Sequence, residues 1–146
     1  MSLELPELRV HDVDGPVAYR EWEGPADTTF VLVHGLGGSH VNWLQVAPGL
    51  AGLGRTIALD LPGFGSSPRE GRGSGIMDER RVLSRFIRAR TSGRVVLAGN
   101  SMGGVIGIMQ AAVEPDSLAG LVLTNSPFPG VRGARPHPVV MAGFAA

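Results

Sequence analysis

One stretch decides the fold that we expect for this chain: Val95-Val96-Leu97-Ala98-Gly99-Asn100-Ser101-Met102-Gly103-Gly104-Val105-Ile106. It consists of an apolar run, a Gly-x-Ser-x-Gly pentapeptide and a second apolar run, which predicts a strand, a sharp turn and a helix. Side chains at Gly99 and Gly103 would collide where the strand and the helix approach each other. The unpaired N–H groups at the start of the helix would face the Ser101 hydroxyl. The pattern therefore predicts Ser101 as a nucleophile beside groups that stabilise negative charge.

The pentapeptide also has a purely structural interpretation as a glycine-rich turn. Glycine accounts for 22 of the 146 residues, so a Gly-x-Ser-x-Gly match arises easily by chance. The apolar runs on both sides supply the strand and the helix that the nucleophile motif requires. This context favours the catalytic interpretation of Ser101.

Towards the N-terminus, the sequence predicts two antiparallel strands, Leu8–Val10 and Val17–Trp22, joined by a tight turn at Asp14-Gly15. The continuously apolar segment Thr29–Val33 predicts a strand that is covered on both faces. The run His34-Gly35-Leu36-Gly37-Gly38-Ser39 follows directly, and its three glycines would let backbone amides point into a cavity. The alternative interpretation of this run is a flexible turn.

The other segments alternate between strand and helix. Strands are predicted at Arg55–Asp60, Arg94–Ala98 and Leu121–Thr124, and helices at Asn42–Leu50 (disturbed by Pro48), Ile76–Thr91 and Gly103–Val113. This alternation predicts an α/β domain with a mostly parallel sheet. We expect the arginines of the Ile76–Thr91 helix to form a solvated face opposite its apolar residues; they are Arg80, Arg81, Arg85 and Arg88.

The pattern changes after Asn125, where prolines become frequent and an apolar segment, Val139–Ala146, follows. We therefore divide the chain into a main domain over residues 1–125 and a second segment over residues 126–146. The apolar end of that segment has no predicted packing partner in the chain.

The composition indicates a single globular domain with no polyanionic partner. Thirteen basic and 13 acidic residues cancel, so no net field attracts nucleic acid or anionic lipid. The chain has no cysteine, which excludes disulfides and thiolate chemistry. Its first residues are acidic and lack the apolar core of a signal peptide, and no apolar run approaches the ~20 residues that span a bilayer. We expect a cytoplasmic protein with neither a membrane nor a nucleic-acid partner.

Three motifs at the ends of three successive predicted strands resemble those of the α/β-hydrolase superfamily. They are Val31-Leu32-Val33-His34-Gly35-Leu36-Gly37-Gly38, Asp60-Leu61-Pro62-Gly63-Phe64-Gly65-Ser66-Ser67 and Gly99-Asn100-Ser101-Met102-Gly103-Gly104. The resemblance extends from about Val17 to Thr124 and implies the N-terminal part of an α/β-hydrolase fold, with a mostly parallel sheet and flanking helices. Residues 126–146 would then begin a cap or lid.

The resemblance implies a serine hydrolase that needs no cofactor and no metal and acts on a small-molecule substrate. Ser101 would attack a carbonyl carbon, and the backbone N–H groups of Leu36 and Met102 would stabilise the oxyanion. Loop support would come from His34, Gly35, Gly99 and Gly103. A serine at the turn argues against the branches with an aspartate nucleophile, and carboxylic ester hydrolysis is the leading reaction class. The Asn-Ser-Met-Gly-Gly sequence also resembles hydrolases that cleave carbon–carbon bonds and, more loosely, cofactor-free haloperoxidases.

The family places an acid and then a histidine after the nucleophile, and neither is found in this chain. Asp116 lies beyond the helix that follows Ser101, and Asn125 occupies the position at the end of the last predicted strand where an acid can lie. His137 lies between two prolines. His11 belongs to the first hairpin, and we expect His40 at the surface or at the start of a helix. We therefore expect the N-terminal part of a longer hydrolase.

Two other interpretations follow from the same residues. A non-catalytic binding or structural domain could retain the glycine-rich turn, because no acid and base accompany Ser101. A sheet that ends at Leu121–Thr124 would leave an edge open for self-association.

Nucleotide binding is excluded because Gly35–Gly38 lacks the G-x-G-x-x-G spacing and the chain has no lysine for a P-loop. Metal catalysis is set aside because no His, Asp or Glu pair has ligand spacing on a helix.

Overall fold

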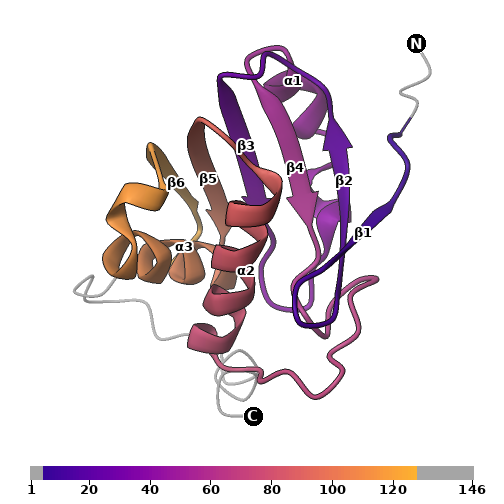
Figure 1. Cartoon of the computed structure of the whole chain (residues 1–146), viewed down its shortest axis with the longest axis vertical. Helices are drawn as coiled ribbons and strands as arrows, with labels where there is room; N and C mark the ends of the chain where they lie inside the picture. Colours follow the sequence, from indigo (N-terminus) through magenta and orange to yellow (C-terminus); the bar gives the residue numbers. More distant parts are fainter. Residues whose placement is uncertain (1–4, 128–146) are drawn as a thin grey trace.

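Six strands form one mixed sheet in the computed structural model, which describes residues 5–127 (Figure 1). The strands are β1 (Arg9–Asp12), β2 (Pro16–Trp22), β3 (Thr28–Val33), β4 (Arg55–Leu59), β5 (Arg94–Asn100) and β6 (Gly120–Thr124). Their order is β1-β2-β4-β3-β5-β6, in which β2 is antiparallel to β1 and β4 and the other neighbours are parallel. The predicted α/β class and the mostly parallel sheet are confirmed.

Helices cover both faces of this sheet. Figure 1 shows α2 (Ile76–Arg90) and α3 (Met102–Val113) on one face and the short α1 (Ala47–Ala51) on the other. Two 3₁₀ turns, η1 (His40–Trp43) and η2 (Pro115–Ser117), complete the elements. No helix within residues 5–127 has the length and apolar character needed to cross a membrane. The segment 128–146, which includes most of the expected cap, lies outside the described residues.

The prediction of one disturbed helix over Asn42–Leu50 is wrong. The structure has η1 and α1 there as separate elements, with Pro48 in the first turn of α1. Proline is tolerated at that position because the first N–H groups of a helix have no acceptor within the helix. Pro48 therefore starts a helix and does not interrupt one.

The first hairpin forms where the sequence predicts it. Asp14 and Gly15, with φ of 52° and 119°, occupy the left-handed region that turns β1 back onto β2. The Asp12 carboxylate accepts a hydrogen bond from Gly15 N at 3.0 Å, which closes the turn.

Side chains from the two faces of the sheet form two apolar clusters. The larger cluster lies under α2 and α3 and includes Val31, Val33, Phe86, Leu97 and Ile106. The smaller one lies under η1 and α1 and includes Trp22, Leu32, Trp43, Ala47 and Ala98. Alternation along β3 assigns Val31 and Val33 to one face and Leu32 to the other, as a strand covered on both sides requires.

The prediction that the arginines of α2 form a solvated face is wrong for Arg80. Its side chain is buried and donates hydrogen bonds to Gln110 Oε1 at 3.1 Å and to Glu114 Oε1 at 2.9 Å. Three other arginines of α2 pair with carboxylates, namely Arg81 with Asp78, Arg85 with Asp14 and Arg88 with Glu114. Arg80 can be buried because the Glu114 carboxylate and the Gln110 amide oxygen, both at the end of α3, compensate its desolvation.

The Glu114 carboxylate joins the two helices on this face. The hydrogen bond from Arg80 lowers the pKa of Glu114, together with hydrogen bonds from Ser84 and Arg88 and against a contribution from burial, to about 2. Its ordinary value is 4.5, so folding favours the ionised form. This contribution to stability is complete above pH 4.5 and is lost as the pH falls towards 2.

Glu114→Gln should flatten the acid side of the stability profile. We expect the urea midpoint of the unchanged chain to fall more steeply than that of the variant between pH 4.5 and 2, because only the unchanged chain takes up this proton on unfolding. Urea denaturation followed by circular dichroism measures both midpoints. Parallel profiles for the two proteins would contradict the assignment.

Glu79, in the first turn of α2, has the opposite dependence on pH. Burial raises the pKa of its carboxyl to about 7, although the hydrogen bond and the charge of Arg69 oppose the shift. Its Oε2 is buried without a hydrogen-bond partner among residues 5–127. Folding therefore favours the protonated form, and this contribution to stability is complete below pH 4.5 and declines as the pH rises through 7.

Glu79→Gln, which copies the protonated acid, should remove that decline. We expect the urea midpoint of the variant to exceed that of the unchanged chain increasingly as the pH rises from 4.5 to 7. Glu7→Gln, the same substitution at an exposed position that makes no contribution to the Glu79 pKa, is the matched control and should leave the slope unchanged. A constant difference between Glu79→Gln and the unchanged chain over this range would refute the prediction.

Candidate active site

Ser101 lies at the sharp turn between β5 and α3. Its backbone adopts φ 51° and ψ −114°, a left-handed conformation that costs about 1–3 kcal/mol in a residue with a side chain. A hydrogen bond from Ser101 N to Thr124 O at 2.9 Å ties the turn to the end of β6. Gly104 N donates to Ser101 O at 3.0 Å as α3 begins. The half-buried serine is thus held in a strained backbone by contacts on both sides.

The predicted collisions at the two glycines of the turn are confirmed. A β-carbon on Gly99 would overlap the Gly103 carbonyl, and one on Gly103 would overlap the carbonyl oxygens of Val33 and His34. The start of α3 therefore packs directly on the backbone of β5 and on the end of β3. Glycine at both positions permits this approach.

The loop between β3 and η1 contacts the Ser101 turn. A β-carbon on Gly35 would lie 3.2 Å from Ser101 Cβ and 3.2 Å from Asn100 O. Gly38 N donates to Gly35 O at 3.0 Å, and Gly37 has φ 74°, so residues 35–38 form a β-turn with glycine at the left-handed third position. The glycine-rich run is therefore an ordered turn whose first residue touches the serine.

The residues that follow Gly35 and Ser101 have backbone N–H groups with no hydrogen-bond acceptor within residues 5–127. Leu36 N belongs to the turn just described, and Met102 N belongs to the first residue of α3. Leu36 is 38% exposed and Met102 is 4% exposed. Free N–H groups at a helix start and in a glycine-rich turn are suited to an anion.

His34 is fully buried, and both of its ring nitrogens are bound. Nδ1 lies 2.7 Å from Gly35 O, and Nε2 lies 3.0 Å from Leu61 N. Since Leu61 N can only donate, Nε2 accepts, and Nδ1 carries the proton of a neutral ring. Burial lowers the pKa of His34, against the Gly35 hydrogen bond and the charge of Asp60. His34 thus links its own loop to the segment that follows β4.

His40 and Asp60 form a buried pair that the sequence did not reveal as part of this region. Of the two positions expected for His40, the surface or the start of a helix, the structure confirms the second: His40 begins η1 and is 5% exposed. Asp60 Oδ1 accepts from His40 N at 2.5 Å, and His40 Nδ1 lies 3.0 Å from both carboxylate oxygens. Ser66 N donates to Asp60 Oδ2 at 2.8 Å. The sequence did contain a signal for this pair. Asp60 follows β4 and the loop with His40 follows β3, and the carboxyl ends of these two parallel strands lie side by side.

No acid or base within residues 5–127 is hydrogen-bonded to the Ser101 hydroxyl. Asp116 lies in η2, beyond the 12 residues of α3, which at 1.5 Å each place it about 18 Å from Ser101. His11, on β1, packs edge-on against Phe86, with ring centroids 6.3 Å apart. His137 lies outside the described residues. The same part of the chain holds no group of three or more residues arranged to bind a metal.

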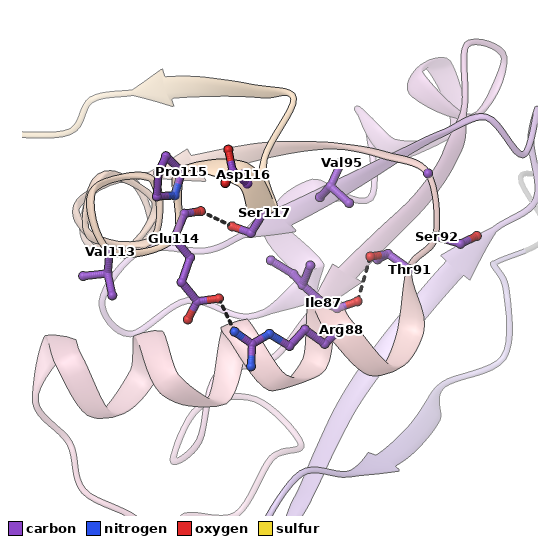
Figure 2. Close-up of a pocket in the computed structure, with 11 residues that line it drawn as sticks. Ile87, Arg88, Thr91, Ser92, Val95, Val113, Glu114, Pro115, Asp116 and Ser117 are labelled. Atoms are coloured by element: carbon purple, nitrogen blue, oxygen red, sulfur yellow. Dashed lines mark hydrogen bonds and ion pairs between the residues drawn. The ribbon is translucent and has the colours of Figure 1, made fainter.

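Two of the cavities among the described residues lie at opposite ends of the parallel strands. The larger, of about 600 Å³, is an open depression between the C-terminal ends of α2 and α3 (Figure 2). Figure 2 shows that Val95 and the Glu114–Arg88 ion pair line this cavity. Val95 lies at the start of β5 and Ser101 follows its end, so the cavity is far from Ser101. The smaller, of about 200 Å³, is lined by Asn42, Trp43, Val46, Asn100 and Thr124 and adjoins the Ser101 turn.

The family model that matches the chain is described as the alpha/beta hydrolase fold and matches residues 28–141. A dihydrolipoyllysine-residue acetyltransferase component of an acetoin cleaving system from Pseudomonas putida is 37% identical, over 73% of this chain and 29% of that protein. A 2-hydroxy-6-oxo-6-(2'-aminophenyl)hexa-2,4-dienoic acid hydrolase from Metapseudomonas resinovorans is 35% identical, over 77% and 40%. Further relatives are named as esterases and lipases.

A solved structure described as a membrane phospholipase A, a bacterial virulence factor, has a TM-score of 0.77 and 35% identity. The alignment covers 88% of this chain and 42% of that one. The chain thus spans less than half the length of these relatives. The matched family model, these relatives and the arrangement of β3, β5 and α3 around Ser101 agree: the chain belongs to the alpha/beta hydrolase family.

Proposed function

We propose that the natural protein is a serine hydrolase that cleaves carboxylic esters of small molecules through Ser101. The observation that carries this proposal is the contact between the strained Ser101 turn and the Gly35–Gly38 turn. Leu36 N in the second turn and Met102 N next to Ser101 have no acceptor within residues 5–127, which supports them as the oxyanion donors. Relatives named as esterases, lipases and hydrolases support the reaction class.

The proposed reaction has two acyl-transfer steps. Ser101 Oγ loses its proton to a base and attacks the ester carbonyl carbon, whose oxygen becomes an oxyanion. The N–H groups of Leu36 and Met102 stabilise that oxyanion, and the alcohol leaves with the proton. Water then attacks the acyl-serine in the same geometry and releases the carboxylic acid. We propose that the base and its supporting acid come from residues beyond 127.

Cleavage of a carbon–carbon bond next to a carbonyl is a second candidate reaction. The sequence Asn100-Ser101-Met102-Gly103-Gly104 and the 35% identical relative named as a hydroxy-oxo-dienoic acid hydrolase favour it. Turnover of a conjugated hydroxy-oxo-dienoate, with simple esters left intact, would select this reaction over ester hydrolysis.

Fluorophosphonate labelling of the intact natural protein tests the role of Ser101. We expect a single phosphonyl adduct on the peptide that contains Ser101, because only an activated serine attacks this reagent. Ser101→Ala should abolish labelling. Ser92→Ala, an exposed serine at the distant depression, should label like the unchanged protein. Absence of labelling in the folded protein, with ligand binding unaffected by Ser101→Ala, would instead favour a binding domain.

Leu36→Pro tests the proposed oxyanion donor, because proline removes the Leu36 N–H and suits the second position of a β-turn. We expect the second-order labelling rate at Ser101 to fall ~10²–10³-fold, the usual cost of losing one such donor. Leu36→Ala keeps the N–H and should label at a rate close to that of the unchanged protein. Equal rates for the two variants would exclude Leu36 N as a donor.

A further inference from the structure

The loop that carries Leu36 is attached at both ends to the segment that follows β4. At its start, His34 Nε2 accepts a hydrogen bond from Leu61 N at 3.0 Å. At its end, His40 N and His40 Nδ1 both donate to the Asp60 carboxylate, at 2.5 and 3.0 Å. Between the two attachments, Gly35 contacts Ser101 and Leu36 presents its free N–H. The position of that N–H therefore depends on both attachments.

The second attachment depends on the His40 imidazole. Asp60 is fully buried, and its carboxylate accepts from His40 N, His40 Nδ1 and Ser66 N. A buried carboxylate requires such hydrogen-bond donors. Loss of the His40 imidazole would remove one donor and favour another conformation of the Asp60 side chain. Because His40 N is bound to the same oxygen, a shift of the Asp60 side chain would move the end of the loop.

We propose that His40 is a positioning residue for the hydrolysis proposed above: by holding Asp60, it fixes the Leu36 N–H at the distance from Ser101 that the oxyanion needs. This inference rests on the proposed function. His40 does not touch the reacting atoms in this account. The competing account, in which the His40–Asp60 pair is the general base, requires the imidazole itself and not merely a donor at the position of Nδ1.

Asparagine and glutamine at position 40 separate these accounts. Asparagine places its amide nitrogen near the position of Nδ1, where it can donate to Asp60, whereas glutamine places it nearer the position of Nε2. We expect His40→Asn to label with fluorophosphonate at a rate close to that of the unchanged protein. His40→Gln and His40→Ala should label about 10²-fold more slowly, as expected for a misplaced catalytic group. With a p-nitrophenyl ester, the loss should appear in kcat, with KM little changed.

Circular dichroism of each variant checks that it is folded, and His11→Ala is the control for loss of a distant histidine. If His40→Ala does not fold, the comparison of His40→Asn with His40→Gln decides alone. Equal labelling rates for His40→Asn and His40→Gln would overturn the positioning role. A His40→Asn variant that labels as slowly as His40→Ala would also overturn it and would favour the general base. An unlabelled unchanged protein would overturn the proposed function and, with it, this inference.

Discussion

The close backbone approach between β3, β5 and the start of α3 is the constraint on which the rest of the site depends. Gly103 packs against the carbonyl oxygens of Val33 and His34, and Gly35 packs against Ser101. These contacts hold Ser101 at φ 51° and bring its turn to the loop that carries Leu36. Because β4, β3 and β5 are parallel neighbours, the segments that follow them meet at the same edge of the sheet.

Buried and half-buried carboxylates join elements of the fold at both ends of the sheet. Asp60 joins the start of η1 to the segment after β4. Glu114 joins α3 to α2 through Arg80 and Arg88, and Glu21 on β2 accepts from Arg9, Arg55 and Arg90. Each carboxylate has several donors, as burial of charge requires. Removing one donor is therefore costly for each of these groups.

Much of the fold could be predicted because its signals are local. The turn at Ser101, the hairpin at Asp14 and the strand at Thr28–Val33 are each encoded by adjacent residues. The buried position of Arg80 and the pairing of His40 with Asp60 were not predicted because the partners are distant in the sequence: Glu114 is 34 residues from Arg80, and Asp60 is 20 residues from His40. Hydrophobic periodicity ranks a charged side chain as exposed unless the partner that compensates it is already known. The roles of Ser101, Leu36 and Met102 remain predictions, since geometry alone does not establish reactivity.

The most direct measurement of the central claim is a peptide map of the intact natural protein after brief incubation with p-nitrophenyl acetate and an acid quench. The account predicts a burst of p-nitrophenol and an acetyl group on Ser101, because the first half of the reaction leaves the acyl group on the nucleophile. A burst with the acetyl group on another residue, or turnover that persists in Ser101→Ala, would contradict it.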